Sequence, residues 1–190
     1  MTKQQDALLA VELMDLTSLN TSDTTKDIQA LINSIRPALG TPAAVCVYSD
    51  FVDDAKIALA ARELSHVKVA TVTNFPTGDA PLSDVINETL IAIERGADEI
   101  DLVIPYKKLA AGDTQATLKY ISESKKACGT QAQLKVIIES GELKTDIGML
   151  VDSSVVVVEN TVNRLSENSK LPKLHVIYRE DRFLLAHGYR

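Results

Sequence analysis

The stretch DEIDLVIPY, residues 98–106, has the pattern of a buried β-strand with a carboxylate inside it. Its apolar run is nearly continuous and ends at a proline: Ile100, Leu102, Val103, Ile104 and Pro105. Runs of this kind are typical of parallel sheets that are covered on both faces. Asp101 needs an explanation in such a strand, because an unpaired buried carboxylate costs several kcal/mol.

Strand patterns alternate with helix patterns on both sides of this stretch. Strands are expected at residues 43–48, 67–75, 98–106 and 134–139. Apolar stripes at helical spacing lie around residues 28–35, 53–65, 82–93 and 113–128. This alternation predicts βαβ units and therefore a parallel sheet.

Two α/β architectures fit this order: a doubly wound open sheet and a (β/α)₈ barrel. Nucleotide-binding open sheets usually carry a glycine-rich first turn, and neither common form of that turn occurs in this sequence. Charges within apolar strands suit a barrel, where polar side chains face the lumen near the C-terminal ends of the strands. We therefore predict an α/β fold of the (β/α)₈ TIM-barrel type.

The composition is that of an ordinary globular protein of 190 residues, with 45% hydrophobic and 24% charged residues. A net charge of −6 argues against nucleic acid or an anionic membrane as the main partner. The N-terminal residues 1–10 lack the apolar segment of a signal peptide, and no apolar run reaches the roughly 18 residues of a membrane span. Cys46 and Cys128 are far apart, which favours reduced thiols over a disulfide or a metal site and predicts a cytoplasmic protein.

Asp101 and Lys135 occupy matching places in successive predicted strands. One interpretation is a structural ion pair, and the other is a proton-transfer pair in a dry pocket; the residues alone favour neither. Cys46 has the default interpretation of a small core residue. Asp15 and Thr17, in LMDLT, are compatible with a simple role at the end of a helix.

Five segments taken together are more specific than any one of them. They are LMDLTSLN (13–20), AAVCVYSDF (43–51), VATVTNFPTG (69–78), ERGADEIDLVIPY (94–106) and LKVIIESGEL (134–143). In this order they strongly resemble the deoxyribose-phosphate aldolase family, over about residues 8–144. That family comprises class I aldolases, which are (β/α)₈ barrels that need neither a cofactor nor a metal.

The resemblance implies a role for each matching residue. The aspartate of the GADE-x-D strand shuttles protons in the family, which carries over to Asp101, and the lysine of LKVII lies in the same pocket, which carries over to Lys135. The resemblance likewise places Cys46 close to the substrate and Asp15 and Thr17 at the substrate end of the pocket. The implied ligand is a small sugar phosphate or aldehyde.

Other family motifs are missing from the sequence. The strand-borne lysine that forms the Schiff base, in a segment resembling D-F-[IV]-K-T-S-T-G, has no counterpart, and neither do the glycine-rich phosphate loops. Lys170 and Lys173 lie in the loop-like SENSKLPKLH (166–175) instead. We therefore predict two regions: residues 1–146 as an aldolase-like part of a barrel, and residues 147–190 as a divergent tail.

Two accounts of the tail fit these observations. The chain is a truncated or frame-shifted relative, which we favour, or its tail was selected to cover a partial barrel that acts by binding. SSVVVVEN (153–160) and LHVIYRE (174–180) are the remaining candidate strands, which gives at most six strands. An incomplete barrel exposes sheet edges, so a homo-oligomer is expected.

The activity that the resemblance implies is reversible cleavage of 2-deoxy-D-ribose 5-phosphate to glyceraldehyde 3-phosphate and acetaldehyde, through a lysine imine. Because no imine-forming lysine is recognisable, we expect this chain alone to show little or no turnover. The alternative is a non-catalytic relative that binds a partner or a sugar phosphate.

Overall fold

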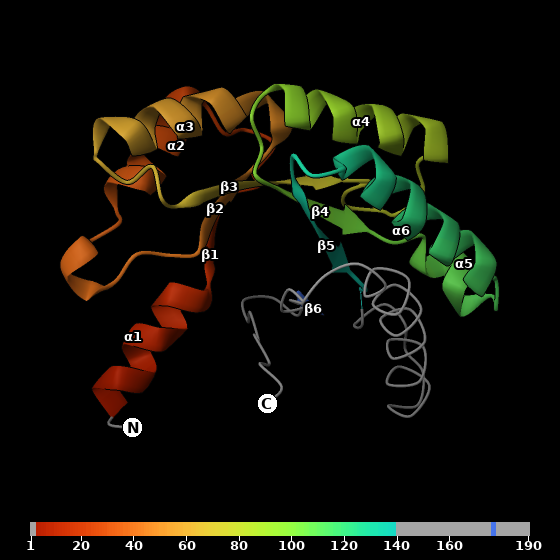
Figure 1. The fold of residues 1–190 in the computed structure, drawn as a ribbon, viewed down its shortest axis with the longest axis horizontal. Helices are drawn as coiled ribbons and strands as arrows, with labels where there is room; N and C mark the ends of the chain where they lie inside the picture. The colour runs from red at the N-terminus through yellow and green to blue at the C-terminus, as the bar shows by residue number, and fades with distance from the viewer. Residues whose placement is uncertain (1–2, 140–175, 178–190) are drawn as a thin grey trace.

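The computed structural model describes residues 3–139 and 176–177 (Figure 1). These residues form a six-stranded sheet whose strand order follows the chain. Every neighbouring pair of strands is parallel. The strands are β1 (Asp15–Thr17), β2 (Ala44–Val47), β3 (Lys68–Thr73), β4 (Glu99–Val103), β5 (Gln133–Ile137) and β6 (Val176–Ile177).

Helices connect the strands and gather along one side of the curved sheet (Figure 1). The helices are α1 (Lys3–Leu13), α2 (Thr25–Asn33), α3 (Val52–Ala61), α4 (Leu82–Glu94), α5 (Tyr106–Ala110) and α6 (Thr114–Cys128), with the short turns η1 (Pro37–Leu39) and η2 (Ser49–Phe51). Figure 1 shows α1, in red, projecting away from the helices that cover the sheet. Within the described ranges no helix has the length and apolar character that crossing a bilayer requires.

The helix boundaries follow from local side-chain chemistry. The Asp27 carboxylate accepts a hydrogen bond from the Thr24 backbone N–H at 2.8 Å, which caps α2. Asp113 caps α6 in a similar way, by accepting from the Ala116 N–H at 3.0 Å. Gly96, at φ +92°, follows the last residues of α4, because glycine enters this left-handed region without a Cβ penalty.

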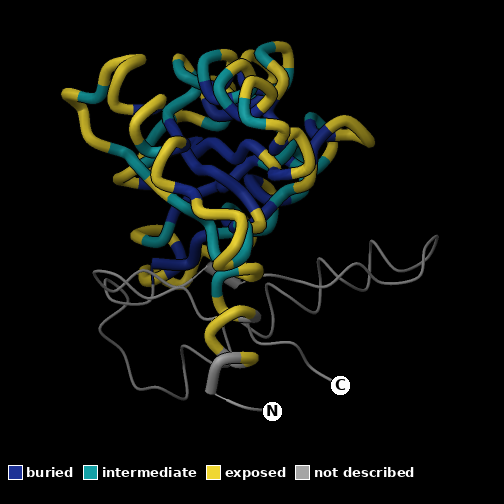
Figure 2. Tube along the Cα trace, turned by 90° about the vertical axis from the view of Figure 1, so that its left-hand side faces the viewer, coloured by how far each residue is buried: buried dark blue, intermediate teal, exposed yellow. Residues whose placement is uncertain are grey.

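The two faces of the sheet are buried in different ways. Side chains such as Val45, Val69 and Ile100 pack with the helices in one apolar cluster. The opposite face carries a smaller cluster whose buried members come from the strands alone: Ala44, Cys46, Ala70, Val72, Val103 and Ile137. Figure 2 shows the buried trace concentrated at the centre of the molecule, with exposed segments around it. We call this second face the lumen face.

The parallel α/β sheet is confirmed, and the four expected strands correspond to β2 to β5. LHVIYRE (174–180) contains β6, whereas SSVVVVEN (153–160) and most of the predicted tail lie outside the described residues. Three elements were not predicted: α1, α5 and the short strand β1.

The loop between β3 and α4 is fixed by Asn74, which has a left-handed backbone (φ +58°) and is 3% exposed. Its Nδ2 donates to the Val103 carbonyl at 2.7 Å, and its Oδ1 accepts from the Ala80 N–H at 2.9 Å. One side chain therefore ties the loop to the end of β4. The adjacent Phe75 ring lies edge-on to Tyr48, with 6.1 Å between the ring centroids.

Replacing Asn74 by alanine should lower the free energy of unfolding by about 2–4 kcal/mol. Two buried hydrogen-bond partners lose their bond, and alanine is strained at a positive φ. Urea denaturation measures the loss. Asn87→Ala is the matched control, because Asn87 is exposed on α4 and its replacement should change stability by less than about 0.5 kcal/mol. Equal stability of the two variants would show that Asn74 does not hold the loop.

Candidate active site

Lys135 lies at the centre of a buried charge cluster on the lumen face. Its side chain is 5% exposed, and its Nζ donates a hydrogen bond to the carboxylate of Asp15. The same Nζ lies 2.9 Å from Oε2 of Glu99 and 3.1 Å from Oδ1 of Asp101. Three carboxylates therefore surround one ammonium group.

The strands bring these residues together from distant parts of the chain. Asp101 and Lys135 are direct partners in the register of β4 and β5. Asp15 comes from β1, which stands at the other end of the strand order from β5 and β6. Its contact with Lys135 therefore crosses the concave face, which becomes the lumen of a barrel.

The proximity and inward direction predicted for Asp101 and Lys135 are confirmed, with 3.1 Å between Oδ1 of Asp101 and Nζ of Lys135. Their predicted place at the C-terminal ends of the strands is wrong. Each is the third residue of a five-residue strand. Side chains alternate along a strand, so Val103 and Ile137 take the next lumen positions towards the C-terminal ends and put the charges one layer deeper.

The charges of the cluster act on one another because water is largely excluded. Burial raises the pKa of Asp101 to about 7, although the Lys135 charge opposes this shift. Burial by itself lowers the pKa of Lys135, but the charges of Asp101, Asp15 and Glu99 outweigh it and raise this pKa above its usual value. Lys135 is therefore protonated at neutral pH, and burial favours the protonated form of Asp101.

Cys46 borders the cluster from β2. Its Sγ donates to Oδ2 of Asp101 over 3.8 Å. Burial and the neighbouring Asp101 charge raise the pKa of this thiol well above its usual value. The thiol is therefore neutral and donates one weak hydrogen bond. Because the thiolate is the nucleophilic form of cysteine, Cys46 is unsuited to act as a nucleophile.

Thr17 does not join the other predicted residues. It is the exposed last residue of β1, and its hydroxyl donates to the backbone carbonyl of Asp15 at 3.4 Å. The structure thus brings Asp15, Cys46, Asp101 and Lys135 together and leaves Thr17 at the edge.

Glu99 is a member of the cluster that sequence reasoning missed. It lies two residues before Asp101 on β4, so both side chains point to the same face. The sequence signal for Glu99 is the E-x-D spacing within GADEID (96–101), because residues two apart in a strand point to the same face.

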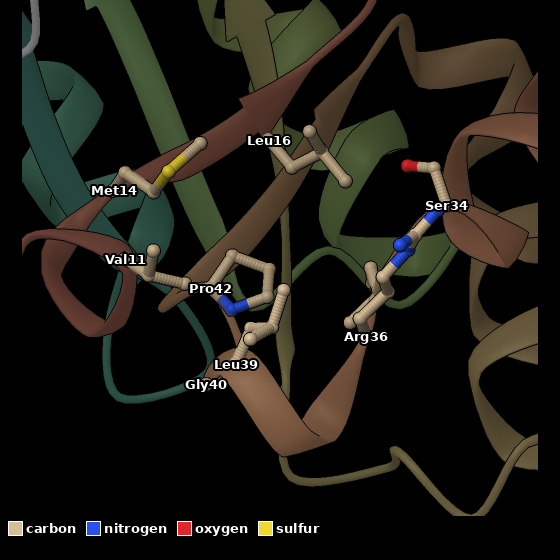
Figure 3. Close-up of a pocket in the computed structure, with 9 residues that line it drawn as sticks. Val11, Met14, Leu16, Ser34, Arg36, Leu39, Gly40 and Pro42 are labelled. Atoms are coloured by element: carbon tan, nitrogen blue, oxygen red, sulfur yellow. The ribbon is translucent and has the colours of Figure 1, made fainter. Parts of the chain in front are cut away.

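Two cavities lie near the sheet. A cavity of about 620 Å³ includes Tyr48, Val72 and Phe75, which also belong to or pack against the lumen-face cluster. This volume suits a small molecule. The second cavity, of about 180 Å³, lies between α1, β1 and η1, and Figure 3 shows its largely apolar lining, which includes Leu16. Leu16 and Asp15 point to opposite faces of β1, so this second cavity is separate from the charge cluster.

A family model described as DeoC/LacD family aldolase matches residues 9–158. The chain belongs to the DeoC/LacD aldolase family. Solved structures agree with this family at the level of the fold. A candidate deoxyribose-phosphate aldolase from Coccidioides immitis is 25% identical, with a TM-score of 0.70, and the match covers 81% of this chain and 57% of that one.

Two further structures resemble this family member. A deoxyribose phosphate aldolase from Aeropyrum pernix, described as having a unique tetrameric structure, is 28% identical, with a TM-score of 0.60 and coverage of 81% and 64% of the two chains. A candidate deoxyribose-phosphate aldolase from Toxoplasma gondii ME49 is 24% identical, with a TM-score of 0.71 and coverage of 83% and 59%.

The predicted (β/α)₈ TIM-barrel class is confirmed by this likeness and by the parallel sheet. A complete barrel of this class has eight strands. The described part of this DeoC/LacD family member holds six parallel strands. The chain spans about three fifths of the length of the Coccidioides and Toxoplasma structures that it matches.

Proposed function

We propose that this chain supplies the proton-relay part of a deoxyribose-phosphate aldolase site of class I. The observation that carries the proposal is the buried pair of Asp101 and Lys135, in which the pKa of Asp101 is raised to about 7. A carboxyl group that gains and loses a proton near neutral pH suits general acid–base catalysis. Membership of the DeoC/LacD aldolase family supports the same chemistry.

Each cluster residue has a role in this proposal. Asp101 moves the proton, and Lys135 stabilises its charged form and orients it together with Asp15. Cys46 lines the pocket beside Asp101, and Thr17 lies at its margin. The proposed reaction is reversible cleavage of 2-deoxy-D-ribose 5-phosphate through a lysine imine, with the 620 Å³ cavity as the route of access.

Lys135 is not the imine-forming lysine in this proposal. An imine requires a neutral amine, but three carboxylates hold Lys135 in its charged form. The sequence carries no recognisable motif for another such lysine, so we expect little or no cleavage by this chain alone.

Borohydride trapping with acetaldehyde, followed by peptide mass mapping, tests this expectation. The expected result is no lysine adduct above the level of a denatured control. The comparison variant is Lys135→Leu. A reduced adduct on Lys135 that disappears together with turnover in this variant would show that Lys135 is the nucleophile.

A second candidate function is binding without turnover. It is favoured by a cavity of about 620 Å³ in a chain without a recognisable imine lysine. Calorimetric titration with 2-deoxy-D-ribose 5-phosphate tests it: saturable binding is the expected result, and no detectable heat of binding would contradict it. We also propose a cytoplasmic protein that self-associates, in line with the tetrameric Aeropyrum relative.

A further inference from the structure

The three carboxylates around Lys135 are held unequally. An ammonium group offers three donors. Asp15 accepts a hydrogen bond, and Glu99 makes an ion contact at 2.9 Å. Asp101 is more distant, at 3.1 Å, and its Oδ1 accepts no hydrogen bond from the described residues. Asp15 therefore holds the ammonium most closely, and Glu99 and Asp101 share its remaining donors, at 2.9 and 3.1 Å.

The cluster also carries an excess of negative charge. Three ionised carboxylates against one ammonium leave two uncompensated charges, which are costly to bury. A proton relieves this cost most where water is scarcest. The exposed fractions of the side chains are 4% for Asp101, 9% for Asp15 and 17% for Glu99, so the proton belongs on Asp101.

We infer that Glu99 is a positioning residue that competes with Asp101 for the Lys135 ammonium and thereby leaves Asp101 able to bind and release a proton. The other groups that face Asp101 are Asp15 from β1, Cys46 from β2 and Lys135 from β5. The register partner of Asp101 on β3 is the apolar Val72. A catalytic role for the Asp101 proton rests on the proposed function. The competition between Glu99 and Asp101 for Lys135 rests on the contacts themselves.

Carboxyl titration measured by NMR tests this inference in the full chain. Aspartate is labelled with ¹³C at its carboxyl carbon, and the Asp101 signal is assigned as the one missing from Asp101→Asn. The midpoint for Asp101 should lie near 7 in the unmodified chain. In Glu99→Gln it should fall by about one pH unit or more, because Lys135 turns to Asp101 and a nearby negative charge is lost.

Two variants control for charge and for structure. Glu94→Gln removes the same charge from an exposed site on α4 and should leave the Asp101 midpoint unchanged. Glu99→Asp keeps the charge and should restore the midpoint towards that of the unmodified chain. A purely structural role of Glu99 predicts no movement of the midpoint in any folded variant.

An unchanged or higher midpoint in Glu99→Gln would overturn the inference. If that variant does not fold, Asp15→Asn tests the same competition from β1: a lower Asp101 midpoint supports it, and an unchanged midpoint overturns it. The titration requires no turnover. A reduced lysine adduct in the borohydride experiment would contradict the proposed role of Lys135 without moving the Asp101 midpoint, and a failed competition would appear in the titration alone.

Discussion

Replacing Lys135 by methionine is expected to lower the free energy of unfolding by about 3–5 kcal/mol at pH 8, the cost of breaking a buried ion pair from one side. Methionine retains the length and apolar stem of lysine but leaves Asp15, Glu99 and Asp101 without their counter-ion. A loss of this size removes much of the roughly 5–15 kcal/mol that holds a typical domain together. Urea denaturation at pH 8 measures it.

The loss should shrink at pH 5, where Asp101 is protonated and adds no negative charge to the cluster. Lys126→Met is the matched control, because Lys126 forms an ion pair with Glu123 on the surface of α6, with 72% of the lysine side chain exposed. Exposed pairs contribute about 0–1 kcal/mol, so this variant should remain close to the unmodified chain at both pH values. Similar losses for both lysines would mean that the buried cluster contributes no more than a surface pair.

The second large effect concerns Asp101 and pH. Its pKa is raised from 3.8 to about 7 in the folded chain. Between these values the folded state holds a proton that the unfolded state has released, so Asp101 makes stability fall as pH rises through this window. At about 1.4 kcal/mol for each pH unit, its contribution changes by about 4 kcal/mol, and it is constant below and above the window.

Asp101→Asn removes this contribution because the amide does not titrate. The difference in unfolding free energy between Asp101→Asn and the unmodified chain should therefore grow in favour of the variant from pH 4 to pH 7, then level off. The carboxylates of Asp23 and Asp27, whose pKa values are lowered by hydrogen bonds, titrate in both proteins and cancel. A difference that stays constant with pH would show that Asp101 ionises normally in the fold.

The sheet and two members of the cluster could be predicted from local patterns. Apolar runs separated by helical stripes identified β2 to β5, and a charge inside such a run singled out Asp101 and Lys135. β1 has three residues and α5 has five, so neither is long enough to show a periodic pattern. α1 lacked a clear apolar stripe that would separate a buried face from an exposed one.

The positions of the other cluster residues depend on how the strands are arranged in space, which no short segment of sequence shows. Glu99 lies inside the expected strand 98–106 and is the first residue of β4, but the pattern of one strand does not show that its side chain reaches Lys135 on the next strand. The contact between Asp15 and Lys135 depends on how far the sheet curves, and curvature is a property of all the strands together. The depth of the charges was mispredicted because an isolated charge in an apolar run does not show which residue after it also faces the lumen; here Val103 and Ile137 do.

The contact between Asp15 and Lys135 joins residues 120 positions apart in the chain. Contacts of such long range form late in folding. Closing a long loop costs conformational entropy, and the contact offsets this cost only after the intervening chain is ordered. We therefore expect β2 to β5, which pair with their neighbours in sequence, to assemble before β1 brings Asp15 to Lys135. By the same reasoning, local opening that releases β1 would separate the charge cluster while most of the sheet remains paired. We therefore expect the intact charge cluster to persist for a shorter time than the folded sheet that surrounds it.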